Sequence, residues 1–99
     1  MNIKIHSIHF DADVKLESFI QSKVKKLSHI YDDIIGAEVF LRIVKSQKSD
    51  NKVTEIKVDI PGSDLFAKKQ AKSFEESTDT AVDALRRQLQ KHKEKKKGV

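Results

Sequence analysis

The chain lacks several residues on which common kinds of functional site depend. It contains no cysteine, which excludes disulfide bonds, thiolate nucleophiles and cysteine-ligated zinc. Only three of its 99 residues are glycine, and no glycine-rich phosphate loop or G-x-S-x-G motif is present. No apolar run approaches the ~20 residues that a membrane-spanning helix needs, and the N-terminus does not resemble a signal peptide. We therefore expect one soluble domain in the cytoplasm.

The side chains that remain for metal binding or catalysis are few and scattered. His6 and His9 are three residues apart in a predicted strand, so their side chains point to opposite faces. A zinc site needs three or four convergent ligands. Asp79 and Asp83 are spaced i,i+4 on a predicted helix, but Asp83 has the same spacing to Arg87, which favours a surface ion pair. We expect no metal, no cofactor and no enzymatic activity.

Positive charge is concentrated in two segments of the chain, whose net charge is +5. Residues 84–97 carry seven Lys and Arg residues against Glu94, a net charge of +6, and residues 15–29 carry a net charge of +3. The rest of the chain therefore sums to −4. Cations near a helix C-terminus also stabilise its exposed carbonyls, but that role does not require seven of them. Basic segments on an acidic body favour binding of a polyanion.

Hydrophobic periodicity predicts six elements in the order β-α-β-β-β-α. Strands are predicted at residues 3–10, 37–44, 53–60 and 65–73, and helices at residues 14–29 and from residue 74 into the basic end. Asp13 is a predicted N-cap, and Ser73 with Glu76 a predicted capping box. The fold class is α+β, with a four-stranded sheet and both helices packed on one face.

The faces of these elements follow from the same pattern. In the second strand, one face is predicted to be buried: Ala37, Val39, Leu41 and Ile43. Charged side chains are predicted on the outer sheet face, in water: Glu38, Arg42, Glu55, Lys57 and Asp59. The apolar stripe of the last helix ends at Leu89. Residues 1–99 are thus one domain, in which residues 91–99 form a basic helix end or tail beyond the core.

The arrangement of the basic residues indicates which polyanion is bound. On the last helix, Arg86, Lys93 and Lys97 lie on one flank and Arg87 and Lys91 across the back, so the charge wraps the exposed surface. Arginine favours bidentate phosphate contacts. Aromatic residues for stacking on unpaired bases are scarce on the basic elements, and the helices show no exposed apolar residues for a membrane surface. Folded RNA, recognised by backbone and shape, fits best.

Three features together resemble a known family. They are "KVKKL" (23–27), the β-α-β-β-β-α order and "DALRRQLQKHKEKKK" (83–97). The chain is similar over essentially its whole length to the ribosome hibernation-promoting factors and the ribosome-associated inhibitor YfiA family, in their short form. The family's D-x-Y-x-A-I-D pattern corresponds here to "SFEESTD" (73–79), in which Asp79 is retained.

The resemblance implies a translation inhibitor that is not an enzyme. Such a protein lies on the small ribosomal subunit, in the channel for messenger RNA and the A- and P-site tRNAs, in stationary-phase or starved cells. Its partners would be the small subunit with its rRNA and the whole ribosome, with no membrane, and the free protein would be a monomer. The rRNA-binding residues implied by position are Lys23, Lys26, Arg86, Arg87, Lys91, Lys93 and Lys95.

Two other functions remain open from the residues alone. A generic double-stranded-RNA-binding module also packs two helices on an antiparallel sheet, but its α-β-β-β-α order lacks the leading strand. The second alternative is a protein-interaction adaptor, in which the basic end is only a solvated tail. Loss of binding with salt would exclude the adaptor, and preference for ribosomes over plain duplex RNA would exclude the module.

Overall fold

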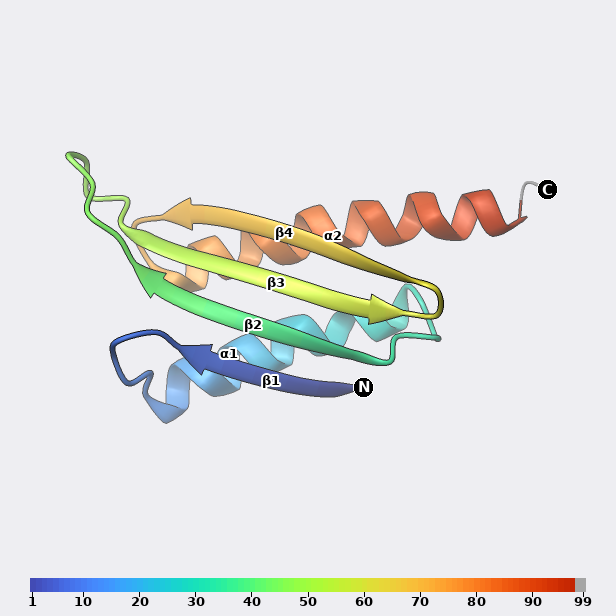
Figure 1. Ribbon diagram of the computed structural model, residues 1–99, viewed down its shortest axis with the longest axis horizontal. Coiled ribbons are helices and arrows are strands. Elements are labelled where there is room, and N and C mark those ends of the chain that lie inside the picture. The colour runs from blue at the N-terminus through green and yellow to red at the C-terminus, as the bar shows by residue number, and fades with distance from the viewer. Residues whose placement is uncertain (98–99) are drawn as a thin grey trace.

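The fold has the predicted order of elements (Figure 1). The computed structural model describes residues 1–97, with side chains to residue 95. The strands are β1 (Asn2–Ser7), β2 (Gly36–Ile43), β3 (Lys52–Ile60) and β4 (Ser63–Ala71). The helices are α1 (Val14–Lys25), the short 3₁₀ helix η1 (Lys26–His29) and α2 (Phe74–Lys97). The predicted α+β fold class is confirmed.

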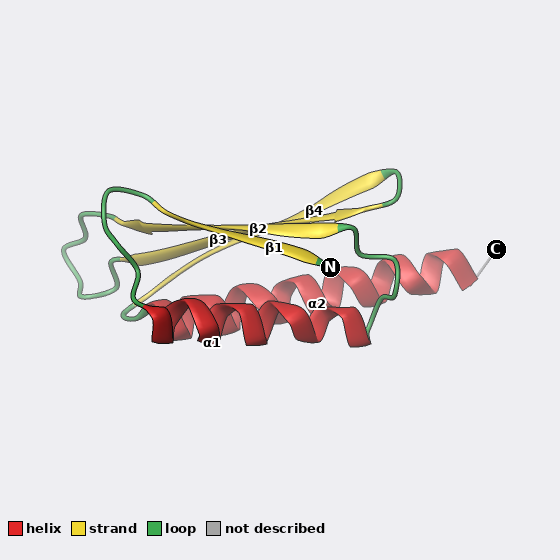
Figure 2. Ribbon diagram, turned by 90° about the horizontal axis from the view of Figure 1, so that it is seen from below, coloured by secondary structure: helices red, strands yellow, loops and turns green. Residues whose placement is uncertain are grey.

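The four strands form one sheet in the order β1-β2-β3-β4. Strand β1 is parallel to β2, whereas β2, β3 and β4 pair antiparallel. Parallel neighbours need a crossover connection, and α1 supplies it. Both helices lie on one face of the sheet (Figure 2), as predicted. We call this the inner face and the opposite one the outer face.

The core lies between the inner face and the two helices. Strands β2 and β3 contribute fully buried side chains, among them Val39, Leu41, Ile56 and Val58. The helices add a buried stripe each: Ile20, Val24 and Leu27 from α1 and η1, and Ala81, Leu85 and Leu89 from α2. These positions recur every three or four residues, as expected for the apolar stripe of an amphipathic helix, and the stripe of α2 ends at Leu89 as predicted.

Two side-chain caps fix where the helices begin. The Asp13 carboxylate accepts a hydrogen bond from the Leu16 amide at 2.8 Å. The Ser73 hydroxyl accepts one from the Glu76 amide at 3.1 Å. Each bond satisfies an amide that has no partner within its own helix. The predicted N-cap at Asp13 is confirmed, and so is the bond from the Glu76 amide to Ser73 in the predicted capping box.

A buried cluster of hydroxyl groups joins β3 to α2. The Thr54 hydroxyl lies 2.7 Å from that of Ser77 and 3.3 Å from that of Thr78. The Ser77 hydroxyl also contacts the Phe74 carbonyl at 3.3 Å. Thr78 therefore belongs to the buried stripe as a hydrogen-bonded polar group. Because a buried polar group is costly without a partner, this cluster fixes where α2 lies along β3.

The first strand is shorter than predicted. It ends at Ser7 instead of Phe10, because His9 adopts a φ of 63° and turns the chain out of the sheet. The Ile8 amide still donates to the Leu41 carbonyl at 2.9 Å. Phe10 stacks on Phe74 with ring centroids 5.2 Å apart. The strand thus ends where the chain turns at His9 and Phe10 packs against α2.

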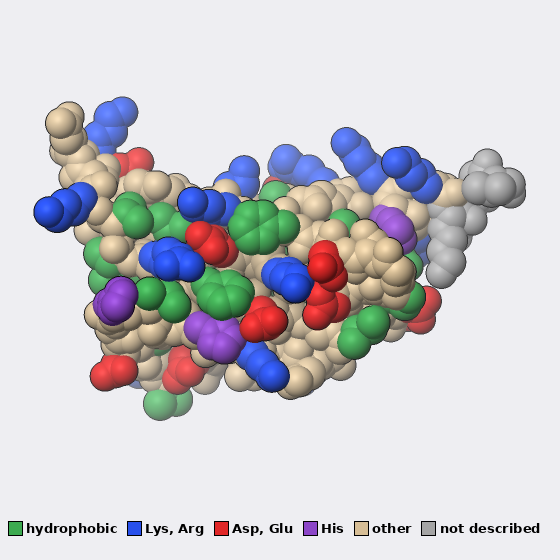
Figure 3. Space-filling view, viewed as in Figure 1, with side chains coloured by type: hydrophobic (Ala, Val, Ile, Leu, Met, Phe, Trp, Pro, Cys, Tyr) green, Lys and Arg blue, Asp and Glu red, His purple; other side chains and the backbone are tan. Residues whose placement is uncertain are grey.

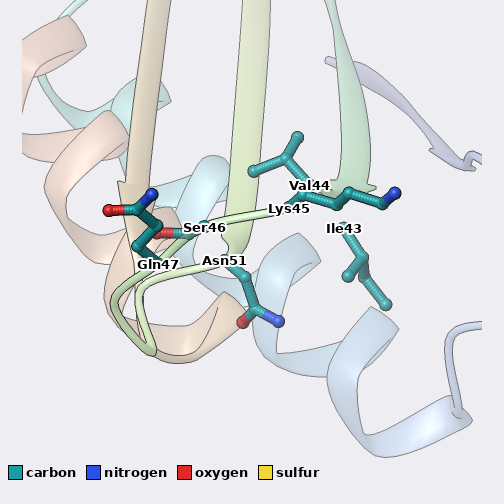
Figure 4. A pocket seen from close by; sticks show the side chains of 6 residues that line it. All are labelled: Ile43, Val44, Lys45, Ser46, Gln47 and Asn51. Atoms are coloured by element: carbon teal, nitrogen blue, oxygen red, sulfur yellow. The ribbon is translucent and has the colours of Figure 1, made fainter.

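The prediction that Ile43 is buried is wrong, since its side chain is 50% exposed. Ile43 pairs with Lys52 where the β2–β3 hairpin opens into its loop, and this loop projects beyond the start of both helices (Figure 2). Ile43 lines an open hollow together with Val44, Lys45 and other residues of this loop (Figure 4). The alternation of β2 therefore continues past the end of the helical cover.

The outer face is also less uniformly wet than predicted. Val53 is only 1% exposed on that face. It is not one of the residues that form the core between the sheet and the helices. It lies in register between Arg42 on β2 and Gln70 on β4. Long polar side chains cover neighbouring apolar surface with their stems, which accounts for the burial of a valine on a charged face.

We expect Leu85→Ala to destabilise the protein by about 2–5 kcal/mol, because it opens a cavity at a fully buried position of α2. Gln90→Ala is the control on the same helix; its side chain is exposed, and such changes cost within ~0.5 kcal/mol. Urea unfolding followed by circular dichroism measures both. Equal midpoints for the two variants would mean that the faces of α2 are misassigned.

Candidate nucleic-acid interface

A groove runs between the two helices on the side away from the sheet. Three apolar side chains line it, those of Leu27, Ile30 and Val82. Charged side chains from both helices also line it, namely Lys23, Lys26, Asp79, Asp83 and Arg86. Ile30 also lines an adjoining hollow together with Gln90, Lys93 and Glu94. We call the two together the inter-helix groove, which follows α2 toward its C-terminal end.

The groove brings four of the seven predicted RNA-binding residues together. Lys23 and Lys26 come from the first basic segment, whereas Arg86 and Lys93 come from the second. The other three candidates do not line the groove: Arg87, Lys91 and Lys95 are exposed elsewhere on α2. The two basic segments thus form one surface, because both helices cover the same sheet face.

An ion pair crosses between the helices at the groove. The Lys23 ammonium lies 3.0 Å from an Asp79 carboxylate oxygen and 5.4 Å from the centre of the Phe19 ring. A cation over an aromatic face is attracted by the ring quadrupole. Two neighbours therefore hold the Lys23 side chain in place, one on each helix.

Asp83 binds both arginines of α2. Its two carboxylate oxygens accept hydrogen bonds from Arg86 at 2.7 Å and Arg87 at 2.6 Å. The predicted pair with Arg87 is confirmed, and the pair with Arg86 was missed, although its i,i+3 spacing is equally suitable. The hydrogen bond from Arg86, with the positive charges of both arginines, holds the pKa of Asp83 below its ordinary value. The carboxylate is therefore ionised at neutral pH.

The remaining lysines of the interface have no such partners. Within residues 1–95, no carboxylate oxygen lies within 4.0 Å of the ammonium nitrogen of Lys26, Lys91, Lys93 or Lys95. These ammonium groups are solvated and can contact phosphate without breaking an existing ion pair.

Helix α2 continues past its last fully buried residue, Leu89. The His92 ring meets the Tyr31 ring edge to face, with centroids 5.6 Å apart, so the body of the protein still contacts this part of the helix. Lys91, Lys93 and Lys95 are exposed around that contact. For the predicted basic end at residues 91–99, the side chains of residues 96 and 97 and all of residues 98 and 99 lie outside the described residues.

The outer face of the sheet has a different character. Basic and acidic side chains are interspersed there, around patches of hydrophobic side chains (Figure 3). Glu55 lies 3.4 Å from Arg42 and 3.8 Å from Lys68. His6 stacks on Phe40 at 4.9 Å between ring centroids. This face pairs its charges locally, whereas the helical face concentrates positive charge.

No other kind of site emerges from residues 1–97. Within them, His, Asp and Glu side chains form no group of three that could hold a metal ion. No helix in this part of the chain is long and apolar enough to cross a membrane.

Comparison with known proteins gives consistent matches along the chain. The family model described as "Sigma 54 modulation protein / S30EA ribosomal protein" matches residues 3–97. A ribosome hibernation promoting factor of Pseudomonas putida is 26% identical over 99 residues, which are 100% of this chain and 93% of that protein. One of Azotobacter vinelandii is 25% identical over 95 residues, which are 96% and 85% of the two chains.

Two solved structures share the fold. The N-terminal domain of Thermus thermophilus Protein Y superposes with a TM-score of 0.78 at 25% identity, covering 93% of this chain and 99% of that one. A ribosomal subunit interface protein from Coxiella burnetii superposes with a TM-score of 0.82, covering 94% and 98%. At 22% identity, the second match shows the fold alone.

We expect the carboxyl group of Asp83 to titrate below the ordinary range of aspartate, because the ionised form is bonded to Arg86 and lies beside Arg87. A lowered folded-state pKa contributes stability above the unfolded-state pKa, which is lost as the pH falls through the folded-state pKa. Arg86→Ala should raise the pKa of Asp83 toward its ordinary value, whereas Lys26→Ala should leave it unchanged. Carbon-detected NMR titration measures all three, and an ordinary midpoint in the unmodified protein would contradict the geometry.

Proposed function

The chain belongs to the Sigma 54 modulation protein / S30EA ribosomal protein family, and on that premise we propose that it is a ribosome hibernation factor. It binds the small ribosomal subunit in the channel for messenger RNA and the A- and P-site tRNAs, and inhibits translation in stationary phase or starvation. The observation that carries the proposal is the inter-helix groove, where cations from two distant segments meet.

Phosphate neutralisation supplies the affinity in this proposal. The RNA contacts are the seven predicted cations: Lys23, Lys26, Arg86, Arg87, Lys91, Lys93 and Lys95. Those of the groove face phosphates directly, and those on the exposed sides of α2 widen the contact. Lysine and arginine contacts to phosphate position a protein but carry no base sequence. Specificity therefore comes from the fit of a rigid pair of helices to the shape of folded rRNA.

Inhibition is steric. A chain that occupies the decoding channel excludes messenger RNA and tRNA without any chemical step, so it needs neither a catalytic group nor a cofactor. Relatives named ribosome hibernation promoting factors, aligned along 100% and 96% of this chain, support this proposal over a generic double-stranded-RNA-binding module. The leading strand β1, parallel to β2, supports it as well, because that module begins with a helix.

We propose that residues 1–99 act as one ribosome-binding domain and that residues 91–99 extend its contact surface. Leu89 is buried, whereas Lys91, Lys93 and Lys95 are exposed along the helix beyond it. This part of α2 thus presents charge at a distance from the core, where it can reach into a neighbouring RNA surface.

Purified small subunits should bind the protein, and Lys26→Ala with Lys93→Ala should weaken that binding about 10- to 100-fold at ~0.1 M salt through two lost phosphate contacts. Both lysines line the groove and are exposed. Lys4→Ala with Lys68→Ala removes the same charge from the outer face, where these lysines lie in register with Glu38 and Glu55, and is the matched control. Co-sedimentation through sucrose measures the binding. Equal losses in the two double variants would contradict a helical interface, and unmodified protein that stays at the top of the gradient would contradict ribosome binding.

The affinity should also fall steeply with salt. If about six phosphates are neutralised, the slope of log affinity against log salt concentration is about −4 to −5. Titration of labelled protein with small subunits over low to moderate salt gives this slope. An affinity that does not change with salt would exclude an electrostatic interface. The basic helix end would then be only a solvated terminus.

A further inference from the structure

The carboxylates of the inter-helix groove have no evident purpose in phosphate binding. Four cations line the groove, but so do three carboxylates, those of Asp79, Asp83 and Glu94. A surface selected only for attraction to phosphate would exclude such residues, because each repels phosphate and competes with it for the same cations.

Fold stability explains little of the Asp83 ion pairs. The side chain of Asp83 is 38% exposed, and those of Arg86 and Arg87 are 51% and 71% exposed. Ion pairs in water contribute little to stability, because solvation and side-chain entropy offset most of the attraction. The main effect of Asp83 is therefore on the arginines themselves.

Asp83 restrains the direction of both guanidinium groups. Arg86 lines the groove, whereas Arg87 lies outside it, yet each places one terminal nitrogen on a different oxygen of the same carboxylate. Each guanidinium keeps further N–H donors, which a phosphate can accept in a fixed geometry. Restraint before binding reduces the ordering cost for an RNA whose phosphates fit those donors.

The same carboxylate penalises an RNA that does not fit. A phosphate that approaches the groove at the wrong place meets the Asp83 charge and must break the pairs with Arg86 or Arg87. Polar groups that repel wrong partners raise specificity at some cost in affinity. Asp79 is placed in the same way beside Lys23: its carboxylate oxygen lies 3.0 Å from the Lys23 ammonium.

We propose that Asp83 is a specificity-determining residue of the interface, which orients Arg86 and Arg87 and selects ribosomal RNA against unrelated RNA. This inference rests on the proposed function. An acidic residue thereby contributes to RNA recognition, and its removal should strengthen binding to unrelated RNA.

The test compares two ligands, purified small ribosomal subunits and a short duplex RNA of unrelated sequence. Asp83→Asn should bind the duplex about 3- to 10-fold more tightly, as expected for one additional effective positive charge at ~0.1 M salt. Its affinity for small subunits should stay the same or fall, so the ratio of the two affinities decreases. Asp83→Glu retains a carboxylate within reach of both arginines and should restore the ratio.

Asp64→Asn is the matched control, since it changes the net charge equally at the start of β4, where Asp64 lies near Lys57 of the outer face. It should leave the ratio unchanged. An unchanged ratio in Asp83→Asn, or an equal decrease in Asp64→Asn, would overturn the inference and leave the proposed function intact. Failure of the unmodified protein to bind small subunits would instead overturn the proposed function, and this inference with it.

Discussion

One-sided burial of the sheet determines the rest of the structure. Only the inner face presents a continuous apolar surface, so α1 and α2 must share it and lie side by side (Figure 2). Each helix buries its apolar stripe against the strands, which leaves its polar flank for solvent or for the other helix. Lys23 and Lys26 are consequently brought to the same groove as Arg86, about sixty residues later in the chain. The positive surface is thus a result of how the core is covered.

The two faces of the molecule divide their charges differently. On the outer face, cations and carboxylates pair across neighbouring strands, as Glu55 does with Arg42 and Lys68. On the helical side, Lys26 and the lysines of α2 after Leu89 remain unpaired among the side chains of residues 1–95, whereas Arg86 and Arg87 share Asp83. A partner with many phosphates is attracted to the helical side as a whole. Within the groove, the carboxylates repel phosphate, so the attraction of each phosphate depends on where it lies along the groove.

Local patterns predicted the elements and their buried faces, because periodicity and caps are properties of short segments. Asp13, Ser73 and the α2 stripe ending at Leu89 were all predicted from the sequence. The end of β1 at Ser7 was missed because it depends on the local conformation of His9. Three further features depend on contacts between distant segments and were missed or wrong: the exposure of Ile43 beyond the helical cover, the burial of Val53 on the outer face, and the group of cations that shares the groove. The seven candidate cations were named by resemblance, and their contacts with RNA remain a prediction. The second partner of Asp83 could have been found from spacing alone, since Arg86 is one turn away.

In the proposed complex the helical side, and not the sheet, faces the RNA of the small subunit. Because the chain has no cysteine, single cysteines introduced at Gln90 on α2 or at the exposed Phe66 on the outer face can each carry an iron chelate that cleaves nearby RNA. With the labelled proteins bound to ribosomes, we expect strong cleavage of small-subunit rRNA around the messenger and tRNA channel from position 90, and weaker cleavage from position 66. Equal cleavage from both positions, or stronger cleavage from the outer face, would contradict this orientation.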